Sequence, residues 1–279
     1  MTIRFLSSVA GYATGSIATL SAASEATYVS AGQAQYYTFP ANPNTGGLRP
    51  SSRILAMGSI PTIIANSGTV ATNGTVTLGT ALQLTYPQAW LYLPAGAIVG
   101  GAAGWYYAIM SSTTVGQVYT AYQATMTQPL ALDPTKLTAA VGSNSAYTGV
   151  TTAVQMAAAV VPAGIMGTQG AVRMTGYWAH NSTAGAKVGG ILFGGSTVLT
   201  SSQTTTLGIN LEKTVHNRAA DKQIIRVAVD NQIAQSVAPT LLSIDTTADV
   251  TASLTGSIAV ATDTMVLESF LIELLHPSA

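Results

Sequence analysis

The alternation of apolar and small polar residues along most of the chain predicts β-strands. Beyond Arg53, Val, Ile, Leu and Tyr alternate with Thr and Ser, for example over residues 115–122 and 187–195. A period of two places the apolar side chains on one face of a sheet. Asn73-Gly74 lies between two β-prone runs, which is the strongest short hairpin signal. The pattern therefore predicts a mainly β fold of short antiparallel strands.

The N-terminal residues carry a different pattern. Residues 3–6 and 16–20 are expected to form two short strands, and a helix is expected to begin near Ser21 and end at Gly32. Residues 1–35 are thus predicted to be a small N-terminal ββα module. Residues 36–53 are rich in Tyr, Pro, Asn and Gly, which favours an arm or linker.

Charge divides the remaining chain into two parts. No Asp, Glu, Lys, Arg or His occurs between Arg53 and Asp133, and most charges follow Arg173. We expect two antiparallel β-sandwich domains with a jelly-roll-like arrangement. Their predicted bounds are residues 54–165 for an uncharged β domain and residues 166–279 for a C-terminal β-sandwich domain. Helices are expected only at residues 131–142 and 151–164, and the second would join the two domains.

The stretch WLYLPAGAIVGGAAGWYYAIM, residues 90–110, has the length and apolarity of a membrane span. Pro94 and four glycines interrupt it, and aromatic runs at its two ends favour strands. No Lys or Arg flanks it to set an orientation. We therefore predict two strands joined by small residues, without membrane insertion.

Composition adds one constraint, which is that the chain is almost free of charge. Only 7% of its residues are charged, against about 25% in typical proteins, and 10 basic residues balance 10 acidic ones. A neutral surface has little self-repulsion and tends to associate. This predicts a permanent assembly in which the uncharged region faces other copies. The lack of a basic patch argues against a nucleic-acid partner.

Catalytic, metal and cofactor motifs are not evident in the sequence. There is no G-x-S-x-G, H-E-x-x-H, P-loop or G-x-G-x-x-G motif, and no Cys. Asp245 and Asp249 are a candidate carboxylate pair for glycoside cleavage, but a turn held by Asp side chains is favoured. Glu268 and Glu273 differ in parity along one predicted strand, so we expect them on opposite faces. We predict no enzyme activity and no cofactor.

A glycan-binding site is the one candidate for ligand recognition. Tyr177, Trp178 and His180 lie close together in the sequence and would form an aromatic platform for a sugar ring, although core positions are the commoner use of such residues. The glycosylation sequons at Asn73 and Asn181 are interpreted as chance matches, because no secretion signal accompanies them.

Three blocks of the sequence resemble proteins of tailed-bacteriophage virions. Residues 58–119 resemble a segment of phage fibres, with an NG turn, the tract YPQAWLYLPAGAI and then GWYYAIMSSTT. Residues 171–275 are similar to the terminal β domain of many phage fibre and tail proteins, ending in DTTADVTASL and DTMVLESFLIELL. Residues 11–34, GYATGSIATLSAASEATYVSAGQA, resemble a small N-terminal module of phage structural proteins.

This resemblance implies a virion location and a homotrimeric fibre, appendage or decoration protein. The N-terminal module would attach the protein to partners in the head, collar or tail. The chain lacks coiled-coil heptads or a β-helical shaft, so a compact knob or shell-bound trimer fits better than a long rod. A receptor-binding tail protein that recognises a host surface glycan is the first alternative, and a polysaccharide depolymerase is the second. A secreted adhesin would need an export signal, which we do not find.

Overall fold

The computed structural model describes residues 2–5, 17–19, 28, 31, 34–36, 52–58, 60–98, 101–123, 145–148, 152–225 and 240–275. The chain divides into an N-terminal unit, residues 1–50, and a second unit, residues 51–278. In the first unit, β1 (Thr2–Phe5) pairs with β2 (Ile17–Thr19) and with β3 (Ala34–Tyr36). The two predicted strands are confirmed, while the helix expected after Ser21 lies mostly outside the described residues.

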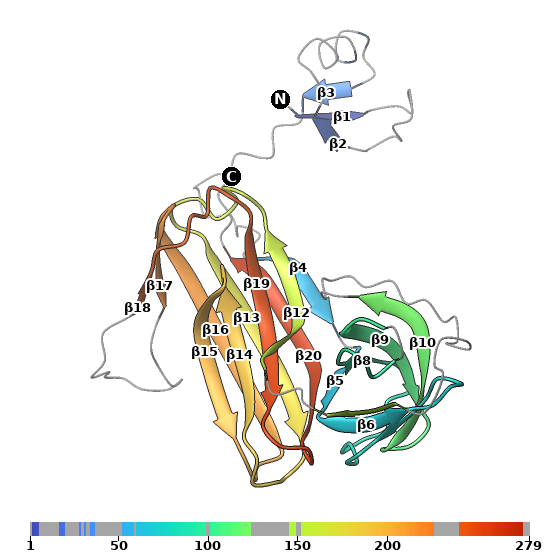
Figure 1. The fold of residues 1–279 in the computed structure, drawn as a ribbon. Coiled ribbons are helices and arrows are strands. Elements are labelled where there is room, and N and C mark those ends of the chain that lie inside the picture. The colour runs from blue at the N-terminus through green and yellow to red at the C-terminus, as the bar shows by residue number, and fades with distance from the viewer. Residues whose placement is uncertain are drawn as a thin grey trace. The chain divides into compact units, whose positions relative to one another are not determined.

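A two-layer sandwich forms most of the second unit (Figure 1). One layer is a four-stranded sheet in the order β12-β19-β14-β15. The facing layer is the order β20-β13-β16-β17-β18 of a larger sheet, with β4 beside β20. The bounds of these strands are β4 (Ser52–Gly58), β12 (Val154–Val161), β13 (Ala171–His180), β14 (Lys187–Phe193), β15 (Ser196–Gln203), β16 (Gly208–Ala219), β17 (Lys222–Ile225), β18 (Thr240–Leu242), β19 (Val250–Ile258) and β20 (Thr264–Leu275).

Alternation explains why these strands pack as a sandwich. In β19, Val250, Ala252, Leu254 and Ile258 are buried in the core between the layers, and the intervening positions are Thr and Ser. Thr suits strands because its β-branched side chain fits a pleated surface, and its hydroxyl faces water without the desolvation cost of a charge. The predicted alternation of apolar and hydroxyl residues is therefore confirmed for this strand.

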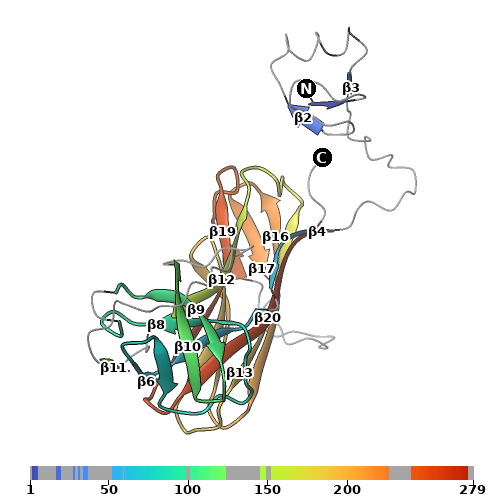
Figure 2. The ribbon, with the colours of Figure 1, turned by 90° about the vertical axis from the view of Figure 1, so that its right-hand side faces the viewer.

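The remaining strands continue the larger sheet beyond β20 and curl around a second core (Figure 2). Their order from the far edge is β11-β6-β7-β10-β9-β8-β5, and β5 pairs with β20. Their bounds are β5 (Thr62–Ala65), β6 (Ser67–Val70), β7 (Thr75–Leu78), β8 (Ala89–Leu93), β9 (Gly104–Met110), β10 (Val115–Gln123) and β11 (Ser145–Thr148). The fold is thus mainly β, and among the described residues it has one sandwich and one curled sheet extension rather than two sandwiches.

The hairpin predicted at Asn73-Gly74 is confirmed. Strands β6 and β7 pair antiparallel on either side of it. Gly74 has a φ of 77°, which non-glycine residues rarely adopt, and its amide donates to the carbonyl of Ala71 at 2.9 Å. The side chain of Asn73 accepts a hydrogen bond from the amide of Thr75 at 3.0 Å, so this sequon asparagine holds its own turn.

The apolar stretch at residues 90–110 is buried by the chain itself. Its ends form β8 and β9, which pair antiparallel as predicted. Trp105 packs into the sandwich core, whereas Tyr106 on the other face packs into the second core. In the described part of the chain, no helix is long and apolar enough to cross a membrane. The expectation that other copies cover this stretch is therefore corrected, because four of its five aromatic side chains are already buried within the chain, namely Trp90, Trp105, Tyr106 and Tyr107.

Two further expectations differ from the structure. The helix expected at residues 151–164 is wrong, because residues 154–161 form β12 and pair with β19. Tertiary pairing outweighs the helix preference of its three consecutive alanines. The boundary expected between residues 165 and 166 also moves. Strands β4 and β12 were expected at the two ends of the uncharged domain. Both instead belong to the sandwich, where β4 pairs with β20 and β12 pairs with β19.

Candidate binding face

The outer face of the larger sandwich sheet is the best candidate for a functional surface. The strand register places its side chains in rows that run across β4, β20, β13 and β16. One row contains Ile54, Glu273, Arg173 and Thr214. The next row contains Met57, Leu271, Thr175 and Glu212. A third row contains Ser269, Tyr177 and Asn210.

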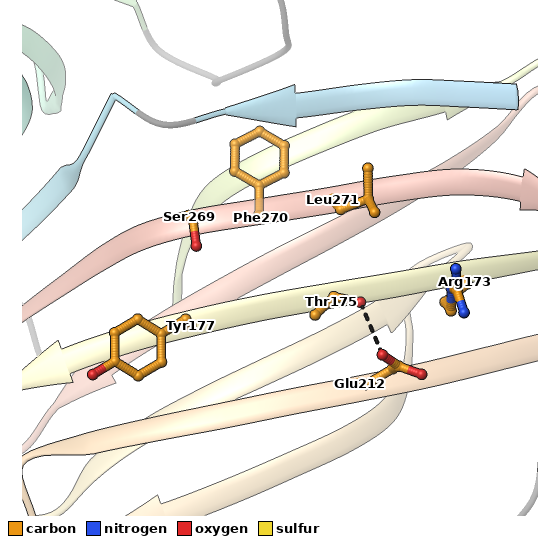
Figure 3. Close-up of a pocket in the computed structure, with 7 residues that line it drawn as sticks. All are labelled: Arg173, Thr175, Tyr177, Glu212, Ser269, Phe270 and Leu271. Carbon is orange, nitrogen blue, oxygen red and sulfur yellow. Dashed lines mark hydrogen bonds between the residues drawn. The ribbon is translucent and has the colours of Figure 1, made fainter.

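A shallow depression of about 370 Å³ lies within these rows (Figure 3). Its floor is low because the short side chain of Thr175 stands between the longer Arg173 and Tyr177 on the same strand. The other side chains that line the depression are Glu212, Ser269, Phe270 and Leu271. It therefore combines two aromatic residues and one aliphatic residue with a cation, a carboxylate and three hydroxyls.

The charges of this face are mostly paired. Arg173 forms an ion pair with Glu273, whose side chain is only 6% exposed. Glu212 accepts a long hydrogen bond from the hydroxyl of Thr175 at 3.4 Å and is otherwise exposed to solvent. This arrangement offers a polar ligand one free carboxylate and the exposed part of one guanidinium.

The structure separates the three residues of the predicted glycan platform. Tyr177 is 46% exposed at the edge of the depression, but Trp178 is completely buried in the sandwich core. Neighbouring residues of a strand point to opposite faces, so the two rings cannot form one platform. His180 is 1% exposed, and its burial lowers its pKa. Tyr177 alone remains available to a ligand.

The carboxylates considered from the sequence have structural roles in the described chain. Asp245 accepts hydrogen bonds from the amide of Thr247 at 2.9 Å and from its hydroxyl, and these bonds lower the pKa of Asp245. Asp249 accepts a bond from the amide of Ala163 at 2.8 Å. The predicted turn is confirmed for Asp245, whereas Asp249 bonds to a segment that is distant in the sequence. Asn181 of the second sequon is also engaged, since its side chain bonds the backbone of Thr262 and Thr264.

No protein-family model matches the chain, and no curated protein matches its sequence. One solved structure is a weak structural neighbour. It is the CBM2 module of the evolved Dit protein of Lactobacillus casei BL23 phage J-1, with 10% sequence identity and a TM-score of 0.25. The match covers 75% of this chain and 96% of that one. A TM-score this low does not establish a shared fold or function.

Glu268 and Glu273 lie on the same side of β20, contrary to the parity expectation. The register between β20 and β13 shifts between Tyr177 and Trp178, so Glu268 is an extra residue at a bulge. A bulge reverses the parity of every residue beyond it. Glu268 accepts a hydrogen bond from the hydroxyl of Tyr86, whereas Glu273 pairs with Arg173. With about 15 Å of strand between them, they still form no common site.

Glu268 joins the sandwich to the curled extension and should respond to pH. Burial raises the pKa of this carboxyl, and the hydrogen bond from Tyr86 opposes that rise in part. A carboxyl with a raised pKa binds its proton more tightly in the folded chain. Its contribution to stability is therefore complete below its unfolded pKa, about 4.3, and is lost as the pH rises through the folded value.

The substitution Glu268→Gln should remove this loss while keeping an acceptor for Tyr86. We expect the variant to gain about 1 kcal/mol or less in unfolding free energy at pH 8, or about 2–4 °C in Tm, with no gain at pH 4. Thermal unfolding followed by circular dichroism at both pH values measures the difference. An equal change at pH 4 and pH 8 would contradict the assignment.

Proposed function

We propose that this protein is a structural component of a bacteriophage virion. It acts as a homotrimeric fibre, appendage or decoration protein that attaches to the head or tail through its N-terminal module. The role is assembly and attachment without catalysis. The sequence resemblance of three blocks to phage virion proteins supports the virion assignment.

One structural observation carries the self-assembling role. Of the eight large apolar side chains that are exposed in the described chain, four lie on the outer face of the larger sandwich sheet, namely Ile54, Met57, Tyr177 and Leu241. Ile54 and Met57 are neighbours on β4, and exposed apolar groups that gather in one place mark interaction surfaces in soluble proteins. The opposite sheet supports the same view by contrast, because its outward positions are mostly Thr and Ser and only Val160 is a large exposed apolar residue there.

Labelling of phage particles tests the virion assignment. Antibody raised against the full chain and coupled to gold should decorate particles of the phage that encodes it, at one repeated position on the head, collar or tail. Particles that lack the gene product serve as the control. Recovery of the protein only as free material, with unlabelled particles, would contradict the proposal.

Host-glycan recognition is the second candidate function, and Tyr177 is the observation that favours it. Its ring is exposed beside Arg173, Glu212 and Thr175, which offer donors and acceptors to the hydroxyls of a sugar. If the protein binds a host polysaccharide, Tyr177→Ala should weaken binding by about tenfold, or 1.4 kcal/mol. Tyr177→Phe should keep most of the affinity because it keeps the ring.

Calorimetric titration of host surface polysaccharide into the full-length variants measures this effect. Leu207→Ala is a control, since Leu207 is 59% exposed and does not line the depression. Unchanged affinity in Tyr177→Ala would remove the depression as the glycan site. Release of reducing ends during the titration would instead favour the depolymerase alternative.

A further inference from the structure

The depression on the outer face of the larger sandwich sheet carries one unpaired charge. Glu212 is exposed, and its carboxylate accepts only the long hydrogen bond from Thr175 and forms no ion pair within the described part of the chain. The other two charges cancel, because the guanidinium of Arg173 pairs with the carboxylate of Glu273. The depression and its border therefore have a net negative charge, which attracts a cationic ligand.

The exposed ring of Tyr177 lies beside this carboxylate. Thr175 is directly opposite Glu212 across β13 and β16, and Tyr177 follows two residues further along β13 on the same face. Diagonal neighbours of this kind have Cβ atoms about 7–8 Å apart, within reach of aromatic and long side chains. Figure 3 shows the ring and the carboxylate on adjacent strands, with the short Thr175 near both. A small group above Thr175 can contact the ring and the carboxylate together.

A protonated amine is the chemical group that uses both contacts. A cation is attracted to the negative face of an aromatic ring. Its N–H groups also donate charge-assisted hydrogen bonds to a carboxylate, which are stronger than neutral ones. The hydroxyls of Thr175 and Ser269 and the exposed part of Arg173 remain for further polar contacts. This spread of donors and acceptors suits a ring with several hydroxyls better than a simple amine.

We propose that the depression binds amino sugars whose amine is free and protonated, with the amine held between Glu212 and Tyr177. This inference rests on glycan recognition at Tyr177, the second candidate function, and adds the class of sugar. Neutral sugars gain no charge attraction from Glu212. Acidic sugars are repelled by it, and Arg173 does not compensate because Glu273 already neutralises its charge.

Oligosaccharides that differ only in acetylation of the amine test the inference. Calorimetric titration of the full-length protein compares glucosamine oligomers with N-acetylglucosamine oligomers of the same length. A buffer of about pH 5.5 keeps Glu side chains ionised and the free amines protonated. We expect the free-amine oligomers to bind about fivefold more tightly, the effect of one exposed ion pair assisted by the ring. Uronic acid oligomers of equal length should bind most weakly.

Glu212→Gln separates the charge of the depression from its shape. The variant keeps an acceptor for Thr175, and residue 212 is exposed, so the fold should be unchanged. We expect it to bind the two kinds of glucosamine oligomer with affinities within about twofold of each other. Asp221→Asn is the matched control, because it removes a carboxylate that is 66% exposed and does not line the depression. It should keep the preference for the free amine.

The outcomes separate the inference from glycan recognition itself. If host polysaccharide binds through Tyr177 but the preference for the free amine is absent, the inference is overturned while glycan recognition stands. A preference that persists in Glu212→Gln also overturns it, because the attraction would then come from elsewhere on the chain. If neither host polysaccharide nor any oligomer binds, both the inference and glycan recognition are overturned.

Discussion

Asp263→Ala should lower the free energy of unfolding by about 3–5 kcal/mol, the usual cost of removing one partner of a buried ion pair. The carboxylate of Asp263 lies 3.2 Å from the ammonium of Lys187, and both side chains are completely buried. The ammonium also donates to the carbonyls of Thr183, Gly185 and Thr204 at 2.9–3.1 Å. Without Asp263, a buried positive charge would lose its only carboxylate partner among the described side chains.

An exposed ion pair elsewhere in the fold is the control for this substitution. Lys222 and Asp221 lie 3.6 Å apart with side chains 61% and 66% exposed. Surface pairs contribute about 0–1 kcal/mol, so Asp221→Ala should change stability by less than about 1 kcal/mol. Chemical denaturation of both variants measures the contrast. Equal, small effects would show that the buried pair does not hold the loops of the sandwich together.

The stability of the wild type should also depend on pH through the ion pair between Asp263 and Lys187. Burial alone would raise the pKa of Asp263, but hydrogen bonds from Thr183 and the amide of Val260, together with Lys187, hold it below its ordinary value. A lowered pKa means that the stabilisation is present above the unfolded pKa, about 3.9. It is lost as the pH falls through the folded value. The unfolding free energy of Asp263→Ala should therefore fall less steeply than that of the wild type as the pH is lowered below about 4.

Trp105→Ala should cost about 3–5 kcal/mol and loosen the curled extension from the sandwich. Trp105 is 1% exposed and belongs to the sandwich core, although its strand β9 is part of the extension. Its indole nitrogen donates to the carbonyl of Gln155 on β12 at 3.0 Å, and its ring packs edge-on against Tyr92. One side chain thus joins the extension to the four-stranded layer of the sandwich.

Trp105→Phe separates the contribution of the ring from that of the hydrogen bond. It should cost less than the alanine variant, because an aromatic ring still fills most of the space. Hydrogen exchange measured by mass spectrometry compares the variant with the wild type. In Trp105→Ala, exchange should accelerate more across residues 60–98 than across β13 and β20. Uniform acceleration over both parts would indicate that the unit unfolds as one and would contradict a local joint.

Local signals in the sequence were sufficient for the strands, but not for their long-range pairing. The Asn73-Gly74 hairpin and the pair β8 and β9 follow from turn residues and aromatic runs. The pairing of β4 with β20 joins residues more than 200 positions apart, and no local pattern encodes it. The same limit explains why the predicted boundary after residue 165 cuts through the sandwich.

The candidate site was only partly predictable because side-chain direction depends on register. Tyr177 of the predicted platform is exposed, but Trp178 next to it points into the core. The bulge opposite these residues placed Glu268 and Glu273 on one side of β20 against the simple parity rule. The exposure of Ile54 and Met57 had no distinctive sequence signal, since it depends on the position of β4 beside β20.

The proposed role requires this nearly uncharged chain to associate with itself, and sedimentation of the full-length protein tests this most directly. Three copies of the 28.4 kDa chain have a mass of about 85 kDa. Permanent assemblies bury large interfaces and therefore remain associated at roughly micromolar protein concentrations. We expect a single species of about 85 kDa throughout a dilution series in that range. A stable, soluble species of 28.4 kDa at every dilution would contradict self-association.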